Sequence, residues 1–228
     1  MNKKNNYKKY VFAIWASLFL TIASIVGVFV SASLGVFGLM PDFRQLENPD
    51  TKLATQIISS DNIVIGKYYF NDNRTPIDFE EIPKQMVEAL IATEDERFYN
   101  HSGIDFKGTS RALIYLGKKG GASTITQQLA RQLFTGVRSR NTLQAIIQKV
   151  KEWVIAVRLE RRYTKNEIIA MYLNIYDFNY NADGLKSASS IYFSKNPEEL
   201  DLNESAMLIG MLKNSSLYNP IRRPELVK

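Results

Sequence analysis

The chain has 228 residues and a formal net charge of +6, with no cysteine and a single histidine, His101. That length allows one packed domain plus an appended segment. Without cysteine there is no disulfide framework and no thiolate metal site, and one histidine excludes a histidine-rich metal site.

The positive charge is concentrated between residues 107 and 165. This stretch holds six lysines and seven arginines against two acids, Glu152 and Glu160, so the rest of the chain is net acidic. Such a block favours an anionic partner, which could be phosphate, nucleic acid or anionic lipid. A solvated helical surface is the alternative interpretation.

The N-terminal region has the pattern of a membrane anchor. Residues 1–10 carry four lysines and no acid, and residues 11–40 contain no charge. Since about 20 apolar residues span a bilayer, we expect a transmembrane helix in 11–40 after a basic cytoplasmic tail in 1–10. A cleaved signal peptide is the alternative, but this apolar region exceeds the usual length. The lysines place the N-terminus in the cytoplasm and the rest outside it, which excludes nucleic acid as a partner.

Residues 41–83 are interpreted as a linker. Alternating runs over 55–59 and 63–70 flank a Ser-Asp-Asn turn, which predicts a β-hairpin. Residues 84–228 are predicted to form a helical domain. Helices are expected over 83–99, 109–116, from 125 onward, and over 143–163, 164–173, 185–193 and 204–213.

Glu94 is the strongest candidate for catalysis. In the helix over 83–99 it continues an apolar series of Val87, Ile91 and Phe98, at spacing i, i+4, i+7 and i+11. Burial on such a stripe disfavours the charged carboxylate and makes it a usable proton acceptor. An ion-paired surface glutamate is the alternative. His101, in the exit turn, has the position of a structural hydrogen-bonding residue more often than that of a catalyst.

A second candidate region follows the glycines at 120–121. Thr124 with Gln127 three residues later predicts a capping box, so a helix starts with open N–H groups and a positive dipole end. Glycines before a helix N-terminus form an anion site, to which Ser123, Gln128 and Arg131 add polar groups. A plain capped surface helix would look the same.

The long helix over 143–163 carries two patterns. Its apolar residues are expected on a core-facing side: Leu143, Ile146, Ile147, Val150, Val154 and Val157. Lys151, Arg158 and Arg162 share another side, and three cations without facing acids indicate an anionic group near them. Ion pairs with Glu152 and Glu160 are the alternative.

Together these features favour a membrane-tethered helical domain in which a general base acts on a substrate held by its phosphates. The anionic substrates near the outer face of a bilayer are phospholipids and lipid-linked sugars. Residue spacing alone does not distinguish between the two.

Four ordered segments resemble the successive motifs of the family 51 peptidoglycan glycosyltransferases, the domain found in class A penicillin-binding proteins and monofunctional transglycosylases. They are ATEDERFYNHSGID, GGASTITQQLARQLF, KVKEWVIAVRLERRYTKNEIIAMYLN and LIGMLKNSSLYNP. The resemblance covers residue 53 to the end. It implies a mainly α, lysozyme-like fold that polymerises lipid II, with the growing lipid-linked glycan as donor and undecaprenyl pyrophosphate as leaving group. It further implies a single-pass protein of the bacterial inner (cytoplasmic) membrane, with cell-wall synthesis proteins as partners.

The resemblance also assigns roles by position. Glu94 corresponds to the general base that deprotonates the acceptor sugar's 4-hydroxyl as it attacks the donor's anomeric carbon with inversion. In the long helix, Lys151 and Arg158 would meet the pyrophosphate, while Glu152 and Glu160 hold the geometry. The full set assigned to substrate binding is Asp95, Phe98, His101, Ser123, Thr124, Gln127, Gln128, Arg131, Lys151, Glu152, Arg158, Glu160 and Asn174.

Two departures from the family pattern stand out. Many members have a second glutamate after Asn174, where this chain has Ile175, so Asp177 is the candidate substitute. The resemblance implies no required cofactor, and the same departure puts assistance by a divalent cation (Mg or Mn) in doubt. No Ser-x-x-Lys or Lys-Thr-Gly motif occurs, so no transpeptidase is predicted in this chain. Whether the chain belongs to a longer bifunctional protein is left open.

Two other functions compete with polymerisation. A lysozyme-like hydrolase or lytic transglycosylase also uses a glutamate on a helical domain, but it acts on finished glycan and needs no cationic pyrophosphate site. The second is a non-catalytic, membrane-anchored protein that binds lipid II or glycan, which Ile175 motivates.

Overall fold

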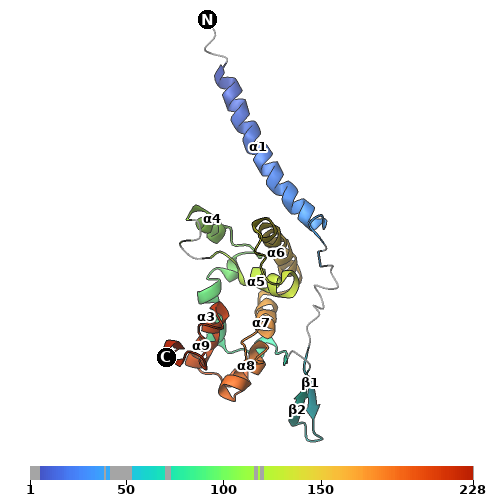
Figure 1. The fold of residues 1–228 in the computed structure, drawn as a ribbon, viewed down its shortest axis with the longest axis vertical. Coiled ribbons are helices and arrows are strands. Elements are labelled where there is room, and N and C mark those ends of the chain that lie inside the picture. The colour runs from blue at the N-terminus through green and yellow to red at the C-terminus, as the bar shows by residue number, and fades with distance from the viewer. Residues whose placement is uncertain are drawn as a thin grey trace.

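A computed structural model describes residues 6–38, 40–41, 53–69, 73–115, 118 and 121–227. An apolar helix, α1 (Asn6–Ser33), rises from a helical domain, and a two-stranded hairpin extends from the domain's opposite end (Figure 1). The hairpin pairs β1 (Thr55–Ile58) with β2 (Val64–Tyr68) in antiparallel register. The predicted mainly α fold with one hairpin is confirmed, while the last residue of the predicted second strand, 70, lies outside the described residues.

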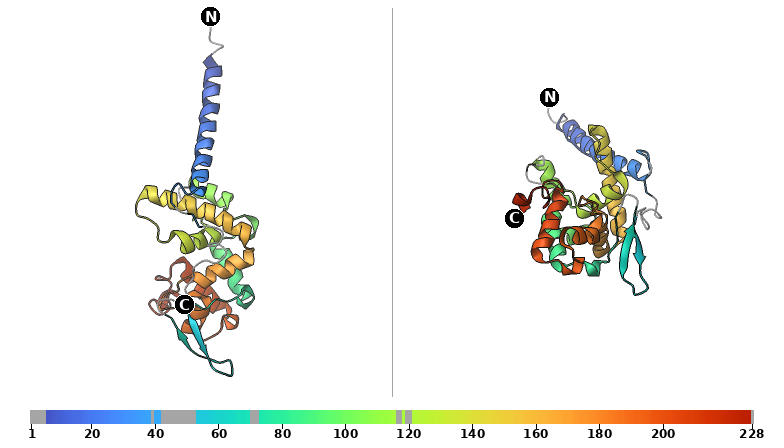
Figure 2. Two further views of the ribbon diagram at one scale, coloured as in Figure 1. Left: turned by 90° about the vertical axis from the view of Figure 1, so that its right-hand side faces the viewer. Right: turned by 60° about the horizontal axis from the view of Figure 1, so that its bottom comes forward.

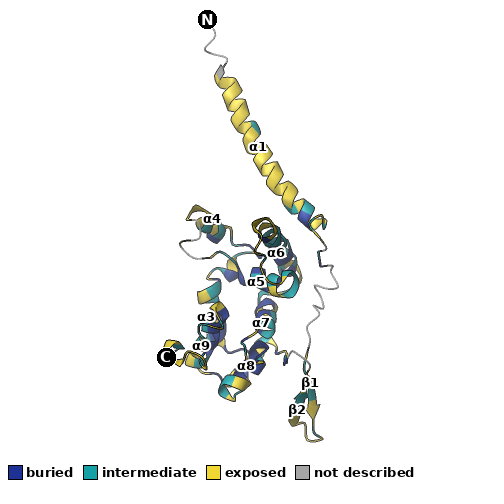
Figure 3. Cartoon of the chain, in the orientation of Figure 1, coloured by how far each residue is buried: buried dark blue, intermediate teal, exposed yellow. Residues whose placement is uncertain are grey.

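Helix α1 is long and apolar enough to cross a membrane, with 27 residues from Tyr7 to Ser33 and a mean hydropathy of 2.3. Its surface is exposed over nearly its whole length (Figure 3). The helix ends at Ser33, well before residue 40, because a Schellman motif closes it. Gly35 adopts φ +80, and the N–H groups of Gly35 and Val36 donate to the carbonyls of Ala32 and Ser31.

The domain is built from helices, most of them short. In chain order they are η1 (Phe79–Glu81), α3 (Lys84–Glu94), η2 (Phe98–Asn100), α4 (Phe106–Ile114), α5 (Ile125–Ala130), η3 (Arg131–Thr135), α6 (Thr142–Arg162), α7 (Lys165–Ile175), α8 (Gly184–Phe193), η4 (Pro197–Glu199), α9 (Leu202–Lys213) and α10 (Pro224–Val227). Every predicted domain helix is present. The largest difference is at α3, which ends at Glu94, whereas the sequence predicts a helix to 99.

Side-chain caps define where several helices begin. Thr124 caps α5 by accepting the Gln127 N–H at 3.1 Å, but the predicted capping box is incomplete, because the Gln127 side chain donates to the Gly103 carbonyl instead. Thr164 and Glu167 form a complete capping box at α7, and Asp201 caps α9 in the same way. Each cap satisfies N–H groups that lack a partner inside the helix, which contributes about 1 kcal/mol.

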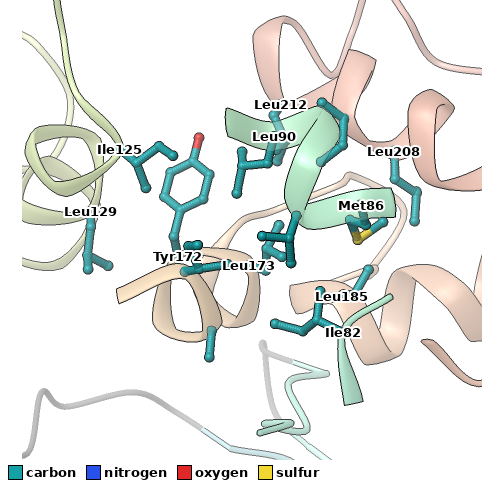
Figure 4. Packing of buried hydrophobic residues seen from close by; sticks show 14 of the residues in the cluster. Ile82, Met86, Leu90, Ile125, Leu129, Tyr172, Leu173, Leu185, Leu208 and Leu212 are labelled. Carbon is teal, nitrogen blue, oxygen red and sulfur yellow. The ribbon is translucent and has the colours of Figure 1, made fainter. Parts of the chain in front are cut away.

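The hydrophobic core lies where α3, α5, α7, α8 and α9 meet. Figure 4 shows Met86 and Leu90 of α3 facing Leu173 of α7 and Leu208 of α9. The Tyr172 ring lies between Ile125 and Leu90, with its hydroxyl pointing away from the labelled apolar side chains (Figure 4). Burying each large apolar side chain contributes roughly 1.5–3 kcal/mol, so this cluster holds the helices around the site together.

Helix α6 packs mainly against α5 and α1. Its buried residues are Ala145, Glu152, Ile155, Ala156 and Leu159. The prediction that the stripe beginning at Leu143 and Ile146 faces the core is wrong, because these side chains are 67% and 57% exposed. One side of α6 packs on α5, and α1 contacts another side, so that α6 lies across the lower end of α1 (Figure 2).

Gly103 brings the turn after η2 directly against α6. It adopts φ +89, and a Cβ there would lie 2.9 Å from the carbonyl carbon and oxygen of Ala156. Its own carbonyl accepts hydrogen bonds from Thr124 Oγ1 at 2.7 Å and from Gln127 Nε2 at 3.2 Å. The turn therefore joins the start of α5 to the middle of α6.

We expect Gly103→Ala to lower the free energy of unfolding by about 2–4 kcal/mol, because it adds both backbone strain and a backbone clash. Thermal unfolding should show a melting temperature lower by about 5–10 °C. Gly121→Ala is the matched control, since a Cβ there meets nothing within 4 Å. Equal melting temperatures for the two variants would contradict the close contact.

Candidate functional site

A cleft of about 440 Å³ opens at the C-terminal end of α3. Its walls come from the segment after α3, the start of α4, the residues before α5 and the end of α9. It brings together Glu94 and Asp95 from one sequence motif and Ser123, Thr124 and Gln128 from another. Other lining residues include Arg97, Arg111 and Lys213, so the cleft contains several cations beside the glutamate.

Glu94 is the last residue of α3 and is half-buried. Its carboxylate accepts a hydrogen bond from Gln128 Nε2 at 2.8 Å, and Gln128 Oε1 accepts one from the Tyr172 hydroxyl at 3.0 Å. The expected apolar stripe is wrong here, because α3 ends at Glu94 and Phe98 lies on the next short helix. Glu94 instead sits at a polar opening, where a hydrogen-bonded chain from the core orients its carboxylate.

Tyr172 and Tyr176 lie close enough to the Glu94 carboxylate to be affected by its charge. Burial raises the pKa of Tyr172 well above its ordinary value, and the charge of Glu94 adds to the effect. Burial likewise raises the pKa of Tyr176 to about 12, with Glu94 again acting in that direction. Arg131 opposes both shifts, so its guanidinium is within electrostatic range of this group. Tyr172 stays protonated at neutral pH and remains a donor to Gln128.

Asp95 ties the end of α3 to the start of α5. The side chains of Asp95 and His101 are only 4% and 7% exposed, and His101 Nε2 lies 3.0 Å from the carboxylate. The same carboxylate accepts the Ile125 N–H at 3.1 Å. Because a carboxylate accepts, Nε2 is the donor in this hydrogen bond.

Phe98 and His101 do not line the cleft. Both are packed beneath it with Lys165, whose ammonium lies 4.2 Å from the Phe98 ring centroid and donates to the His101 carbonyl at 2.7 Å. Their assignment to substrate binding is corrected to a supporting position. For His101 this is the structural interpretation that the sequence favoured.

Lys149 is the cation that sequence reasoning missed. Its ammonium donates to Ser123 Oγ at 3.0 Å, to Gln127 Oε1 at 2.9 Å and to Glu152 Oε2 at 3.1 Å. Burial lowers the pKa of Lys149, Glu152 opposes that shift, and Arg131 with Arg138 adds to it. The signal that could have found Lys149 is its spacing of i, i+3 and i+11 with Glu152 and Glu160, which places all three on one side of α6.

The other predicted cations of α6 face the opposite way. Arg158 is nine residues from Lys149, which rotates it by about 180° around the helix. Its guanidinium donates to the carbonyl and hydroxyl of Ser33 at the end of α1. The Lys151 ammonium lies 3.0 Å from the position a Cβ on Gly38 would take. The structure therefore places Lys151 and Arg158 toward α1 and not among the residues that line the cleft, while their predicted contact with a pyrophosphate stays a prediction.

Glu160 is also a supporting residue. It accepts hydrogen bonds from Thr126 Oγ1 at 2.5 Å and Lys165 Nζ at 2.7 Å, with its side chain 5% exposed. These contacts join α5, α6 and α7 beneath the cleft.

Asn174 and Asp177 lie away from the cleft. The Asn174 amide bonds both the N–H and the carbonyl of Ile77, at 3.1 and 2.8 Å, and so holds the segment before η1. Asp177 is exposed, and its carboxylate accepts the Asn179 N–H at 2.7 Å within its own turn. Neither is among the residues that line the cleft with Glu94, and the roles predicted for Asn174 and Asp177 stay predictions.

The acids that line the cleft do not form a preassembled group of metal ligands. Across the described residues, no three Asp, Glu, His or Cys side chains gather in a metal-binding group. Asp95 is held by His101 and Ile125, and Arg97 holds Asp105 in an ion pair that lowers the pKa of Asp105. These carboxylates already have protein partners.

Comparison with known proteins places the chain in a family. Residues 61–228 match the family described as Transglycosylase. Penicillin-binding protein 1A of Escherichia coli (strain K12) is 39% identical over 186 residues, which are 80% of this chain and 21% of that protein. Penicillin-binding protein 1F of Bacillus subtilis (strain 168) is 39% identical over 176 residues, 75% of this chain and 24% of that protein.

A third relative, penicillin-binding protein 1A of Pseudomonas aeruginosa, is 33% identical over 216 residues, 92% of this chain and 25% of that protein. The chain thus spans between 21% and 25% of the length of these relatives. The family pattern covers most of the chain and includes every residue of the cleft. The chain therefore belongs to the transglycosylase family, the glycosyltransferase unit of class A penicillin-binding proteins.

Proposed function

We propose that the chain is a peptidoglycan glycosyltransferase that polymerises lipid II into glycan strands. The observation that carries the proposal is one cleft in which an oriented carboxylate, Glu94, shares a wall with a group of cations. A general base and a cationic site for a departing anion are the two parts that transfer from a lipid pyrophosphate requires. Membership of the transglycosylase family supports the same reaction.

In the proposed mechanism Glu94 accepts the proton of the acceptor sugar's 4-hydroxyl. The resulting oxygen forms a bond to the donor's anomeric carbon while the bond from that carbon to the pyrophosphate breaks, with inversion. Undecaprenyl pyrophosphate leaves with the electron pair. Gln128 holds the carboxylate through one oxygen, which leaves the other available for the proton.

The positive side of the site supports departure of the pyrophosphate. Lys149 is fixed beside Ser123 by three hydrogen bonds, and Arg131 and Arg138 are close enough to shift its pKa. Preorganised cations stabilise charge that develops on a phosphate in the transition state. The proposed mechanism contains no step through a divalent cation, since the carboxylates of the cleft do not gather into a donor set.

The face of the domain toward α1 supports a lipid-linked substrate. Large apolar side chains are exposed there on α4, on the loop before α6 and on the start of α6, namely Phe106, Leu113, Ile114, Val137, Leu143 and Ile146. Both helices lie on the α1 side of the domain (Figures 1 and 3). We propose that this face meets the outer leaflet of the bacterial inner membrane, which α1 crosses once, and that cell-wall synthesis proteins are partners.

Replacing Glu94 with glutamine should reduce lipid II polymerisation by about 10²–10⁴-fold, the usual contribution of a general base. Purified full-length chain in detergent, assayed for glycan product by gel, would measure this. Glu88→Gln is the matched control, an exposed glutamate of α3 that pairs with Lys84 outside the cleft. A hydrolase would degrade finished glycan instead, and a non-catalytic binder would make no polymer even as wild type.

Asp177→Asn should change the polymerisation rate by less than about twofold, since exposed residues away from the site rarely contribute more than ~0.5 kcal/mol. Asparagine can still accept the Asn179 N–H, so the turn is kept. A large loss of rate with unchanged folding would show that Asp177 is the second acid after all.

Lys149→Arg should extend activity to higher pH. Because burial lowers the pKa of Lys149, its ammonium deprotonates at a lower pH than an ordinary lysine, and polymerisation should fall as pH rises through that value. Arginine, with a pKa above about 12, keeps its charge. The pH profile of initial rates measures the shift, with exposed Lys107→Arg as control. If the initial rates of wild type and Lys149→Arg fall at the same alkaline pH, Lys149 is excluded as the titrating cation.

A further inference from the structure

The end of α1 is docked on the domain. We call this contact the anchor junction; it comprises Phe29 and Ser33 of α1 with Trp153 and Arg158 of α6. The Phe29 and Trp153 rings are stacked, with centroids 5.8 Å apart and planes at 23°. Ala32, between the two α1 residues, is fully buried, although nearly all of α1 is exposed. The helix is thus packed against the domain over its last two turns.

Arg158 closes the junction by capping the helix end. The final carbonyls of a helix lack partners and carry the negative end of its dipole, so a cation there is favoured. One terminal nitrogen of Arg158 donates to the Ser33 carbonyl at 3.1 Å and to its hydroxyl at 3.0 Å. The other donates to the Pro41 carbonyl at 3.3 Å. The planar guanidinium of an arginine can donate to the Ser33 and Pro41 carbonyls at the same time, whereas a lysine ammonium would reach only one of them.

The junction relates the domain to the membrane surface. Phe29 precedes the end of α1 by four residues, about 6 Å along the helix axis, so its partner Trp153 lies level with the last turn of α1. Tryptophan prefers that interfacial depth in a bilayer. Lys149 lies on the side of α6 opposite Arg158, and its ammonium donates to Ser123, a residue that lines the cleft. One rigid helix therefore connects the anchor to the cationic side of the site.

We propose that Arg158 and Trp153 are positioning residues that lock α6 to the membrane anchor and so hold the cleft at one height and tilt above the bilayer. The contact between α1 and α6 is inferred from the geometry of the junction alone. Its effect on turnover rests on the proposed function. The pyrophosphate of a lipid-linked sugar lies at headgroup level. A domain that swung freely on its linker would present Lys149 at that level for only part of the time, which lowers the apparent affinity in proportion.

Trp153 reports directly on the lock, because the chain has two tryptophans, Trp15 and Trp153. The full-length chain carrying Trp15→Phe would be reconstituted in vesicles whose lipids bear bromine at defined acyl positions. We expect the shallowest labels to quench Trp153 most strongly. Adding Arg158→Ala should reduce that shallow quenching at least about twofold, with Arg158→Lys intermediate, because hydrogen bonds from Arg158 hold the end of α1, and with it Phe29, against Trp153. Arg161→Ala, which removes an exposed arginine of the same helix, is the matched control.

A polymerisation assay distinguishes a positioning role of Arg158 from a role in folding. For Arg158→Ala, kcat/KM should fall about tenfold with lipid II embedded in vesicles, the factor expected for losing one charge-assisted interaction. With lipid II in detergent micelles, where height above a bilayer has no meaning, the change should stay below about twofold. Circular dichroism would confirm that each variant is folded.

The outcomes are distinct. Unchanged shallow quenching in Arg158→Ala overturns the lock. Reduced quenching with equal loss of activity in vesicles and micelles overturns the positioning role, since the change would then be a general structural defect. If no form of the protein polymerises lipid II, the proposed function fails, while the quenching comparison still decides whether Arg158 docks the anchor.

Discussion

The carbonyl oxygen of Gly103 is the point on which the geometry of the site depends. It accepts hydrogen bonds from Thr124 and Gln127 at the start of α5, while the glycine itself rests against the backbone of α6. Any side chain at this position would push the turn away from α6. With the turn in place, α5 begins where the Gln128 amide can donate to the Glu94 carboxylate. The side-chain oxygen of Gln127 then accepts a hydrogen bond from the Lys149 ammonium.

Helix α6 then connects this part of the site to the end of α1. Its inner side holds charged groups that are expensive to bury unless each is paired, and Lys149 with Glu152 meets that requirement. Glu160 meets it through Thr126 and a lysine of α7. The outer side of α6 carries Arg158, which donates to the Ser33 carbonyl at the end of α1. A change on either side of this helix is transmitted through a rigid element, because packed helices do not deform continuously.

Much of the fold was predictable from local signals. The N-cap at Thr124 and the capping box at Thr164 act within four residues, and the hairpin follows from alternation around a short polar turn. The end of α1 also had a local signal in Gly35, whose left-handed conformation stops the helix before the apolar run ends. Glu94 and the segment that begins with Ser123 were identified as parts of one site from their motifs, and the cleft contains both.

The sequence by itself predicted most of the helices, an N-terminal apolar helix long enough to cross a membrane, the family and the candidate base. Only the tertiary structure decided which cation of α6 contacts Ser123 beside the cleft, because helical spacing places Lys149 and Arg158 on opposite sides of α6 without stating which side meets α5 and which meets α1. The same holds for the long apolar stripe of α6, which has the spacing of a core face and lies largely outside the core. A one-dimensional pattern fixes which residues share a face, and the partner of that face depends on contacts between segments far apart in the chain.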